Sequence, residues 1–133
     1  MYEIKPDEEH AIISLVVKGH VNLEEITRFV EELEDQTLAF AGRELKILAD
    51  MRQFKPTSSE VASMLQDVQE FGLRNGVIRV AEIVQSAAAA VQLNIVARRS
   101  KTDQVLRRFP PSDLDLARQW LITGELPPSE QDE

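Results

Sequence analysis

The chain has 133 residues, the size of one domain and enough to close a core without metal or disulfide bonds. It contains no cysteine, which excludes thiolate chemistry and Cys-based zinc sites and is compatible with a reducing cytoplasm. Its net charge of -8, from 23 acids and 15 bases, disfavours nucleic acid or an anionic membrane surface as the main partner.

The N-terminal segment and the longest apolar run do not have the features of a signal peptide or a membrane span. The segment Met1–Lys5 lacks the apolar centre of a signal peptide. The longest run of small and apolar residues, Ala87–Ala97, is interrupted by Gln92 and Asn94 and is shorter than the ~20 residues that a bilayer span needs. We therefore expect a cytoplasmic protein without membrane insertion.

The first elements are two strands. Tyr2–Lys5 predicts a short strand, and Pro6–Glu9 predicts the turn that follows it. The run Ala11–Val17 is apolar except for Ser14, a pattern typical of a strand that is covered on both faces. We expect it to be a central strand.

The next segments predict a helix, a strand and a second helix. Asn22, with Glu25 three residues later, has the spacing of a capping box. Leu45–Ala49 is too short for a helix and predicts a strand, and Thr57 with Glu60 again has the capping-box spacing. The two helices carry apolar stripes at Leu23, Ile26, Phe29, Val30 and Leu33, and at Val61, Met64, Leu65, Val68 and Phe71.

The run Val77–Val84 predicts another strand, interrupted by Arg79 and Glu82. A strand buried between two helix layers does not tolerate unpaired charges. The two charges therefore predict that part of one sheet face is open or contacts a partner.

The remaining segments predict a helix, a short strand and a last helix. Ser86 is the expected N-cap of the third helix, whose small residues Ala87–Ala90 allow close approach to the sheet. Val105–Phe109 predicts the last strand, and Ser112 the N-cap of a fourth helix that ends at Gly124. Three residues of this helix are expected to face inward: Ala117, Trp120 and Leu121.

The predicted order is β-β-α-β-α-β-α-β-α, which indicates an α/β fold. Right-handed crossovers between neighbouring strands place the helices mainly on one face of the sheet. We expect a single domain over residues 1–124, followed by a disordered acidic tail over 125–133, which is rich in proline and has little to bury.

Few residues suggest chemistry. Asp50 and Arg52 lie at the carboxyl end of a strand, where functional groups collect in parallel sheets, and predict an ion pair that orients the loop or, as a remote alternative, an acid/base enzyme site. Thr57, Ser58 and Ser59 lie at a helix N-terminus, where hydroxyls act as caps and a phosphate would be stabilised.

Known catalytic and metal-binding motifs are not recognisable in the sequence. His10 and His20 do not have the spacing of a helical metal pair. The five glycines form no phosphate-binding loop or nucleophile elbow. We therefore predict no catalytic residue, no cofactor and no metal.

The element order resembles the SpoIIAA-like, STAS-type families. The resemblance rests on the strands Leu45–Asp50 with Met51-Arg52 and Ile78–Val84, and on Arg107–Phe109 with Ala117–Leu121. It implies a non-enzymatic regulator that binds a protein partner or a small ligand. The family's anti-sigma-factor antagonists carry a phosphorylated Asp-Ser-Ser-Gly motif, whereas this chain has Thr57–Glu60, which implies the branch without phosphorylation.

Two functional hypotheses follow. The first is a non-catalytic STAS-like module that acts through protein association, as a homodimer or with a regulatory partner; Asp50, Arg52, Thr57, Ser58, Ser59, Arg79 and Glu82 are its candidate interaction residues. The second is a carrier or sensor for a small apolar or lipid-like ligand, held between sheet and helices. Its motive is the small-residue segment Ala87–Ala90, which leaves room beside Met64 and Phe71.

Overall fold

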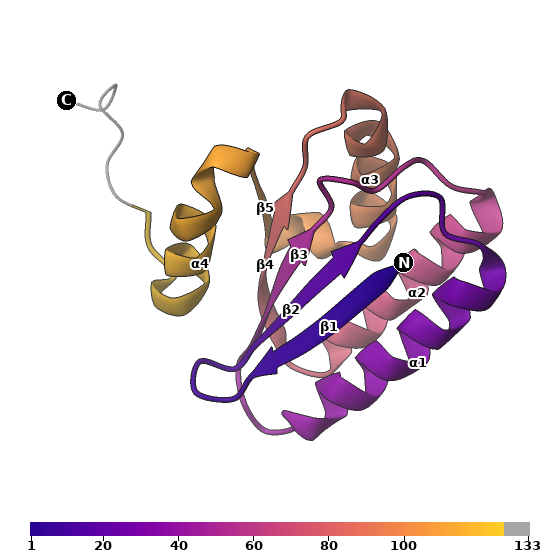
Figure 1. The fold of residues 1–133 in the computed structure, drawn as a ribbon. Coiled ribbons are helices and arrows are strands. Elements are labelled where there is room, and N and C mark those ends of the chain that lie inside the picture. Colours follow the sequence, from indigo (N-terminus) through magenta and orange to yellow (C-terminus); the bar gives the residue numbers. More distant parts are fainter. Residues whose placement is uncertain (127–133) are drawn as a thin grey trace.

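A computed structural model describes residues 1–126 and shows one five-stranded sheet in the order β1-β2-β3-β4-β5 (Figure 1). Three helices, α1, α2 and α3, cover one face, and α4 packs on the other. The predicted α/β fold is confirmed. The elements are β1 (Tyr2–Asp7), β2 (Ile12–Val17), α1 (Leu23–Ala39), β3 (Leu45–Asp50), α2 (Ser59–Arg74), β4 (Val77–Ile83), α3 (Ala87–Ser100), β5 (Leu106–Phe109) and α4 (Leu114–Thr123).

The first two strands form an antiparallel hairpin within the same sheet, and all later neighbours are parallel. β1 continues to Asp7, two residues beyond the predicted end, because Pro6 lies on the outer edge of the sheet, where its missing N–H breaks no ladder bond. The turn ends at Ala11, which has a φ of 53°. The predicted turn over Pro6–Glu9 therefore begins too early.

Side-chain caps begin three of the helices. Asn22 accepts a hydrogen bond from the Glu25 amide at 2.8 Å, and Ser86 accepts one from the Ala89 amide, as predicted. α2 is capped by Ser58 rather than Thr57. The prediction for α4 is wrong: Pro111–Asp113 forms a 3₁₀ turn, and α4 begins at Leu114 without a side-chain cap.

Two apolar clusters lie on opposite faces of the sheet. The larger one joins α1, α2 and α3 to the sheet, and the smaller one lies under α4. The smaller cluster consists of Ile12, Leu48, Ala81, Ile83, Phe109, Ala117, Trp120 and Leu121. Trp120 lies with its ring centroid 5.9 Å from that of Phe109. The short helix α4 therefore buries a second core that depends on Trp120.

Arg79 and Glu82 do not lie at an open part of the sheet, so the inference from these two charges is wrong, although part of one face is open elsewhere. The Arg79 guanidinium donates to the Leu121 carbonyl at 2.9 Å, close to the C-terminal end of α4, where the helix dipole favours a cation. The Glu82 side chain points the other way, into the helix-covered core, and only 3% of this residue is exposed. Both charges are accommodated because each has a partner within the fold.

Within residues 1–126, no helix combines the length and the apolar character needed to cross a membrane. The predicted acidic tail lies outside the described residues from residue 127 onward. At its start, Glu125 and Leu126 follow α4 in an exposed, irregular conformation.

The packing of α4 can be tested with Trp120→Ala. Removing this buried ring should lower the free energy of unfolding by about 3–5 kcal/mol, because the cavity it leaves cannot close fully. Ile122→Ala, on the same helix but 39% exposed, should cost less than about 1 kcal/mol. Urea unfolding of both variants measures the difference, and equal losses would contradict the arrangement of α4.

Candidate functional site

The face of the sheet that carries α4 is covered only in part. α4 packs against β3 and β4 and reaches Phe109 of β5. On this face, α4 reaches Asp7 of β1 and Ile12 of β2. The other side chains of β1 and β2 on this face are Glu3, Lys5, Ser14 and Val16, which we call the open sheet strip. Glu3 and Lys5 are exposed, and Ser14 and Val16 are partly exposed. The open part of the sheet thus lies at the opposite end from Arg79 and Glu82.

An ion pair stands at the end of the open sheet strip, where Asp50 lies beside Val16 in the register of β2 and β3. Arg52 holds both carboxylate oxygens of Asp50, with Nε 2.9 Å from Oδ1 and Nη2 2.6 Å from Oδ2. These hydrogen bonds lower the pKa of Asp50 and keep it charged. The pair closes the turn after β3, which is the orienting role that the sequence predicts.

The hydroxyls before α2 are held by the fold to different degrees. Thr57 Oγ1 donates to the Val21 carbonyl at 3.0 Å, and the Thr57 backbone exchanges two hydrogen bonds with the Gln92 side chain. Ser58 Oγ accepts from the Val61 amide at 3.3 Å. Ser59 is exposed at the first position of the helix. Thr57 and Ser58 therefore anchor the loop and the helix, and this arrangement accounts for both without a ligand.

A buried polar cluster forms where β4 and β5 run side by side. Glu82 Oε1 accepts a hydrogen bond from Arg108 Nε at 2.7 Å, and Arg108 Nη1 donates to Asn94 on α3. Arg108 Nη2 is buried without a hydrogen-bond partner among the described residues. Burial raises the pKa of Glu82, while the Arg108 charge and hydrogen bond lower it.

Sequence reasoning found Glu82 but missed Arg108 and Asn94. Glu82 and Arg108 are 26 residues apart in the chain and become neighbours only through the parallel register of β4 and β5. The available signal was a strand carrying an internal acid next to a strand carrying an internal base. It becomes useful only when the strand order is known, because cross-strand pairs require adjacency.

A small cavity lies between the sheet and the helices α1, α2 and α3. Its volume is about 80 Å³, and Glu82 contributes to its wall. Met64 and Phe71 do not line this cavity, so the cavity does not lie at the position that the sequence predicts. The lining residues are Leu15, Val17, Phe29, Leu33, Thr37, Ile47, Ala49, Met51, Leu65, Val68, Gln69, Gly72, Leu73, Val77, Val80, Glu82, Leu93 and Thr102.

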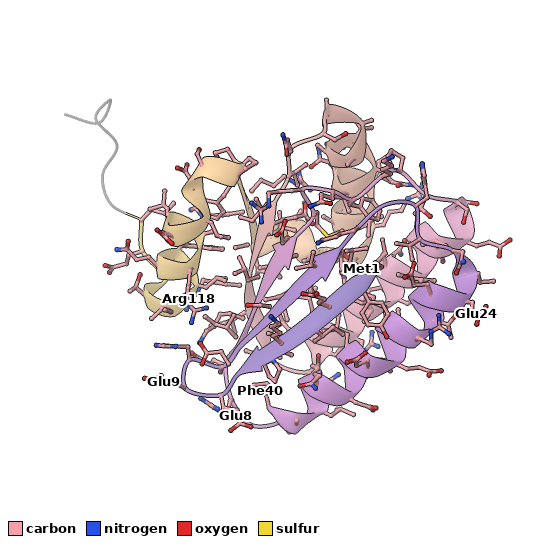
Figure 2. All side chains as sticks on the ribbon, in the orientation of Figure 1. Met1, Glu8, Glu9, Glu24, Phe40 and Arg118 are labelled. Carbon is pink, nitrogen blue, oxygen red and sulfur yellow. The ribbon has the colours of Figure 1, made fainter. Side chains whose placement is uncertain are left out.

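A second polar cluster connects the β1–β2 turn to α4. Asp7 Oδ2 lies 2.6 Å from Arg118 Nη2 and 2.9 Å from His10 Nδ1, and Figure 2 shows Arg118 beside the turn that carries Glu9. The hydrogen bond to His10 and then the one to Arg118 lower the pKa of Asp7 to about 2. Asp7, Glu9 and His10 have ligand atoms within 4.8 Å of one another, but Arg118 already supplies the cation at Asp7.

Replacing Arg108 tests the buried ion pair. Arg108→Leu leaves Glu82 without a counter-charge, so its pKa, already raised in the folded state, should rise further. An acid whose pKa is higher in the folded state than in the unfolded state lowers the free energy of unfolding of the protein as the pH rises from the unfolded pKa to the folded pKa. The variant should therefore lose about 3 kcal/mol near pH 8 and less at pH 4.5.

Urea unfolding at the two pH values measures the effect of Arg108→Leu. The control is Arg107→Leu, in the same strand, where the exposed guanidinium lies over the Trp120 ring. This control should lose less than about 1 kcal/mol, with little dependence on pH. A loss for Arg108→Leu that does not grow with pH would show that Glu82 is not charged in the native protein.

Comparisons with known proteins agree with the observed fold. The chain has 20% sequence identity with an uncharacterised protein of the DUF3478 family with a SpoIIAA-like fold from Shewanella loihica PV-4 (TM-score 0.60, covering 91% of this chain and 92% of that one). It has 14% identity with the protein TM1081, solved by NMR (TM-score 0.57, 90% of each chain). A comparison with curated protein sequences finds no match. The SpoIIAA-like family model matches residues 12–122, and the chain therefore belongs to the SpoIIAA-like family.

Proposed function

We propose that this SpoIIAA-like chain is a non-catalytic regulatory module that acts through protein association, as a homodimer or with a regulatory protein partner. The observation that carries this proposal is the end of the sheet at β1, where the outer edge of β1 pairs with no strand among residues 1–126 and the side chains of the open sheet strip are exposed or partly exposed. Sheets with an unpaired edge strand commonly bind another chain along that edge. The absence of cysteine supports a reducing compartment, and we propose the cytoplasm.

The arrangement of the charged groups supports a non-catalytic role. A general base must have a free lone pair that faces a substrate. Both oxygens of Asp50 accept hydrogen bonds from Arg52, and the lowered pKa of Asp50 makes it a weak base. This geometry favours an orienting function for the pair over acid/base chemistry.

The cavity favours a second candidate function, the binding of a small apolar ligand. Its wall is mainly apolar, which suits such a molecule. Its volume of about 80 Å³ is well below the roughly 300–1,000 Å³ of pockets for drug-sized ligands. The cavity therefore supports a ligand of a few heavy atoms, and a lipid-like ligand would require α2 to move away from the sheet.

Native mass spectrometry combined with hydrogen exchange tests the association proposal. The purified protein should give a dimer, or a complex with a protein partner, without additional small-molecule mass. Raising the protein concentration should slow exchange in residues 1–17. The exposed side of α3 that carries Val91 and Ile95 is the internal control and should not change. A monomer with no protected segment and no captured protein would contradict the proposed function.

A substitution that fills the cavity tests whether the cavity is an empty packing defect or a ligand-binding site. Ala49→Val places two carbon atoms into the cavity and should raise the free energy of unfolding by about 1 kcal/mol. Ala81→Val, in β4 on the opposite face at a fully buried position under α4, is the matched control and should lower it by about 1–3 kcal/mol. If wild-type protein carries a retained small molecule, Ala49→Val should remove that mass; persistence of the mass would show that the ligand binds elsewhere.

A further inference from the structure

The outer edge of β1 pairs with no other strand among residues 1–126, and its hydrogen-bonding groups can be assigned from the hairpin. Met1 and Lys18 exchange two backbone hydrogen bonds, at 2.8 and 3.1 Å. Hydrogen-bonded and non-hydrogen-bonded pairs alternate along an antiparallel ladder, so Glu3, Lys5 and Asp7 also direct their backbone groups toward β2. The backbone groups of the even-numbered residues, Tyr2, Ile4 and Pro6, therefore point away from the sheet.

Pro6 agrees with this assignment independently. Proline has no N–H and is tolerated in a strand where that position faces the outer edge. Pro6 lies opposite Ile13, in a pair that exchanges no hydrogen bonds according to the alternation. The N–H groups of Tyr2 and Ile4 have no hydrogen-bond acceptor among residues 1–126, so this edge offers unpaired donors and acceptors.

The side chains of β1 are suited to pair with a second copy of the same strand. Glu3 and Lys5 project on the face of the open sheet strip and have opposite charges. When two copies of β1 pair antiparallel, residues whose backbone groups point away from β2 must lie opposite each other. This requirement allows a two-fold axis at Glu3, Ile4 or Lys5. An axis at Glu3 opposes two glutamates and an axis at Lys5 opposes two lysines. Only the axis at Ile4 places each Glu3 opposite a Lys5.

We propose that two copies of this chain join antiparallel through their β1 edges, with a two-fold axis at Ile4, to form one continuous sheet. This inference rests on the proposed association function and specifies its surface and partner. Ile4 exchanges both backbone hydrogen bonds with the partner's Ile4, and the Tyr2 N–H donates to the carbonyl of the partner's Pro6. Glu3 pairs with the partner's Lys5 in the non-hydrogen-bonded positions, where cross-strand side chains are closest.

Two features limit the strength of this contact. The missing N–H of Pro6 leaves the carbonyl of the partner's Tyr2 without a donor, so the paired segment is short. Each copy also carries a net charge of -8, which opposes association. A small interface of this kind gives a transient dimer, with an expected Kd on the order of micromolar or weaker.

A charge exchange tests the register. Glu3→Lys and Lys5→Glu each place like charges opposite each other at two symmetric positions, and each should weaken dimerisation roughly tenfold. The double variant Glu3→Lys/Lys5→Glu restores opposite charges across the axis and should return the Kd to the wild-type value. Sedimentation equilibrium at several protein concentrations measures the three variants and the wild type.

The single variants also separate this contact from an effect of net charge. Glu3→Lys makes the chain less negative, so a general reduction in repulsion would strengthen association, whereas the proposed register requires it to weaken. Ile4→Pro removes an N–H that points away from β2, so it should abolish the dimer while the β1–β2 ladder keeps its bonds. Circular dichroism and thermal melting verify that each variant is folded.

The possible outcomes distinguish this inference from the proposed function. Weaker dimerisation in both single variants, with recovery in the double variant, would establish the β1 contact. A wild-type dimer that is insensitive to these changes would overturn the β1 contact and leave association through another surface. A wild-type protein that stays monomeric at millimolar concentration would overturn the homodimer, while a complex with a different protein would still support the regulatory module.

Discussion

Right-handed crossovers between successive parallel strands determine what this fold covers and what it leaves open. Because β2, β3, β4 and β5 are neighbours in chain order, the helices between them must all pack on the same face. Only α4, which follows the last strand, is free to cover the other face. Its 10 residues span about 15 Å, enough to cover β3 and β4 and to reach Ile12 of β2 and Asp7 of β1, but not the rest of β1 and β2. The open sheet strip and the free edge follow from this order.

The same constraint explains why the charges of β4 are structural. β4 lies between β3 and β5 and has helices on both faces, so Arg79 and Glu82 must each find a partner inside the fold. Arg79 uses a carbonyl close to the end of α4, and Glu82 uses the side chain of Arg108 in the adjacent strand. The expectation that charges in a buried strand mark an open face overlooked the possibility that the neighbouring strand supplies a matched charge.

Local features of the fold were predictable from the sequence, and long-range pairings were not. The caps Asn22 and Ser86 and the pair Asp50–Arg52 depend on residues within three positions of each other, so spacing alone identifies them. Thr57 and Ser58 are adjacent hydroxyls that can both cap a helix, serine being the better cap, and tertiary contacts also favour Ser58 because Thr57 bonds to the Val21 carbonyl and to Gln92. The start of α4 was predicted too early, with a cap at Ser112, because Pro111–Asp113 forms a 3₁₀ turn before the helix.

The open edge and the cavity are physically separate, which makes the two candidate functions independent. No residue of β1 lines the cavity among the described residues; the nearest strand that contributes is β2, through Leu15 and Val17. The edge contact uses outward backbone groups and the face with the open sheet strip, whereas the cavity lies on the opposite face under α1, α2 and α3. A second chain could therefore bind β1 without closing the cavity. Coupling between the two would require α1, which packs against both β1 and α2, to change its position.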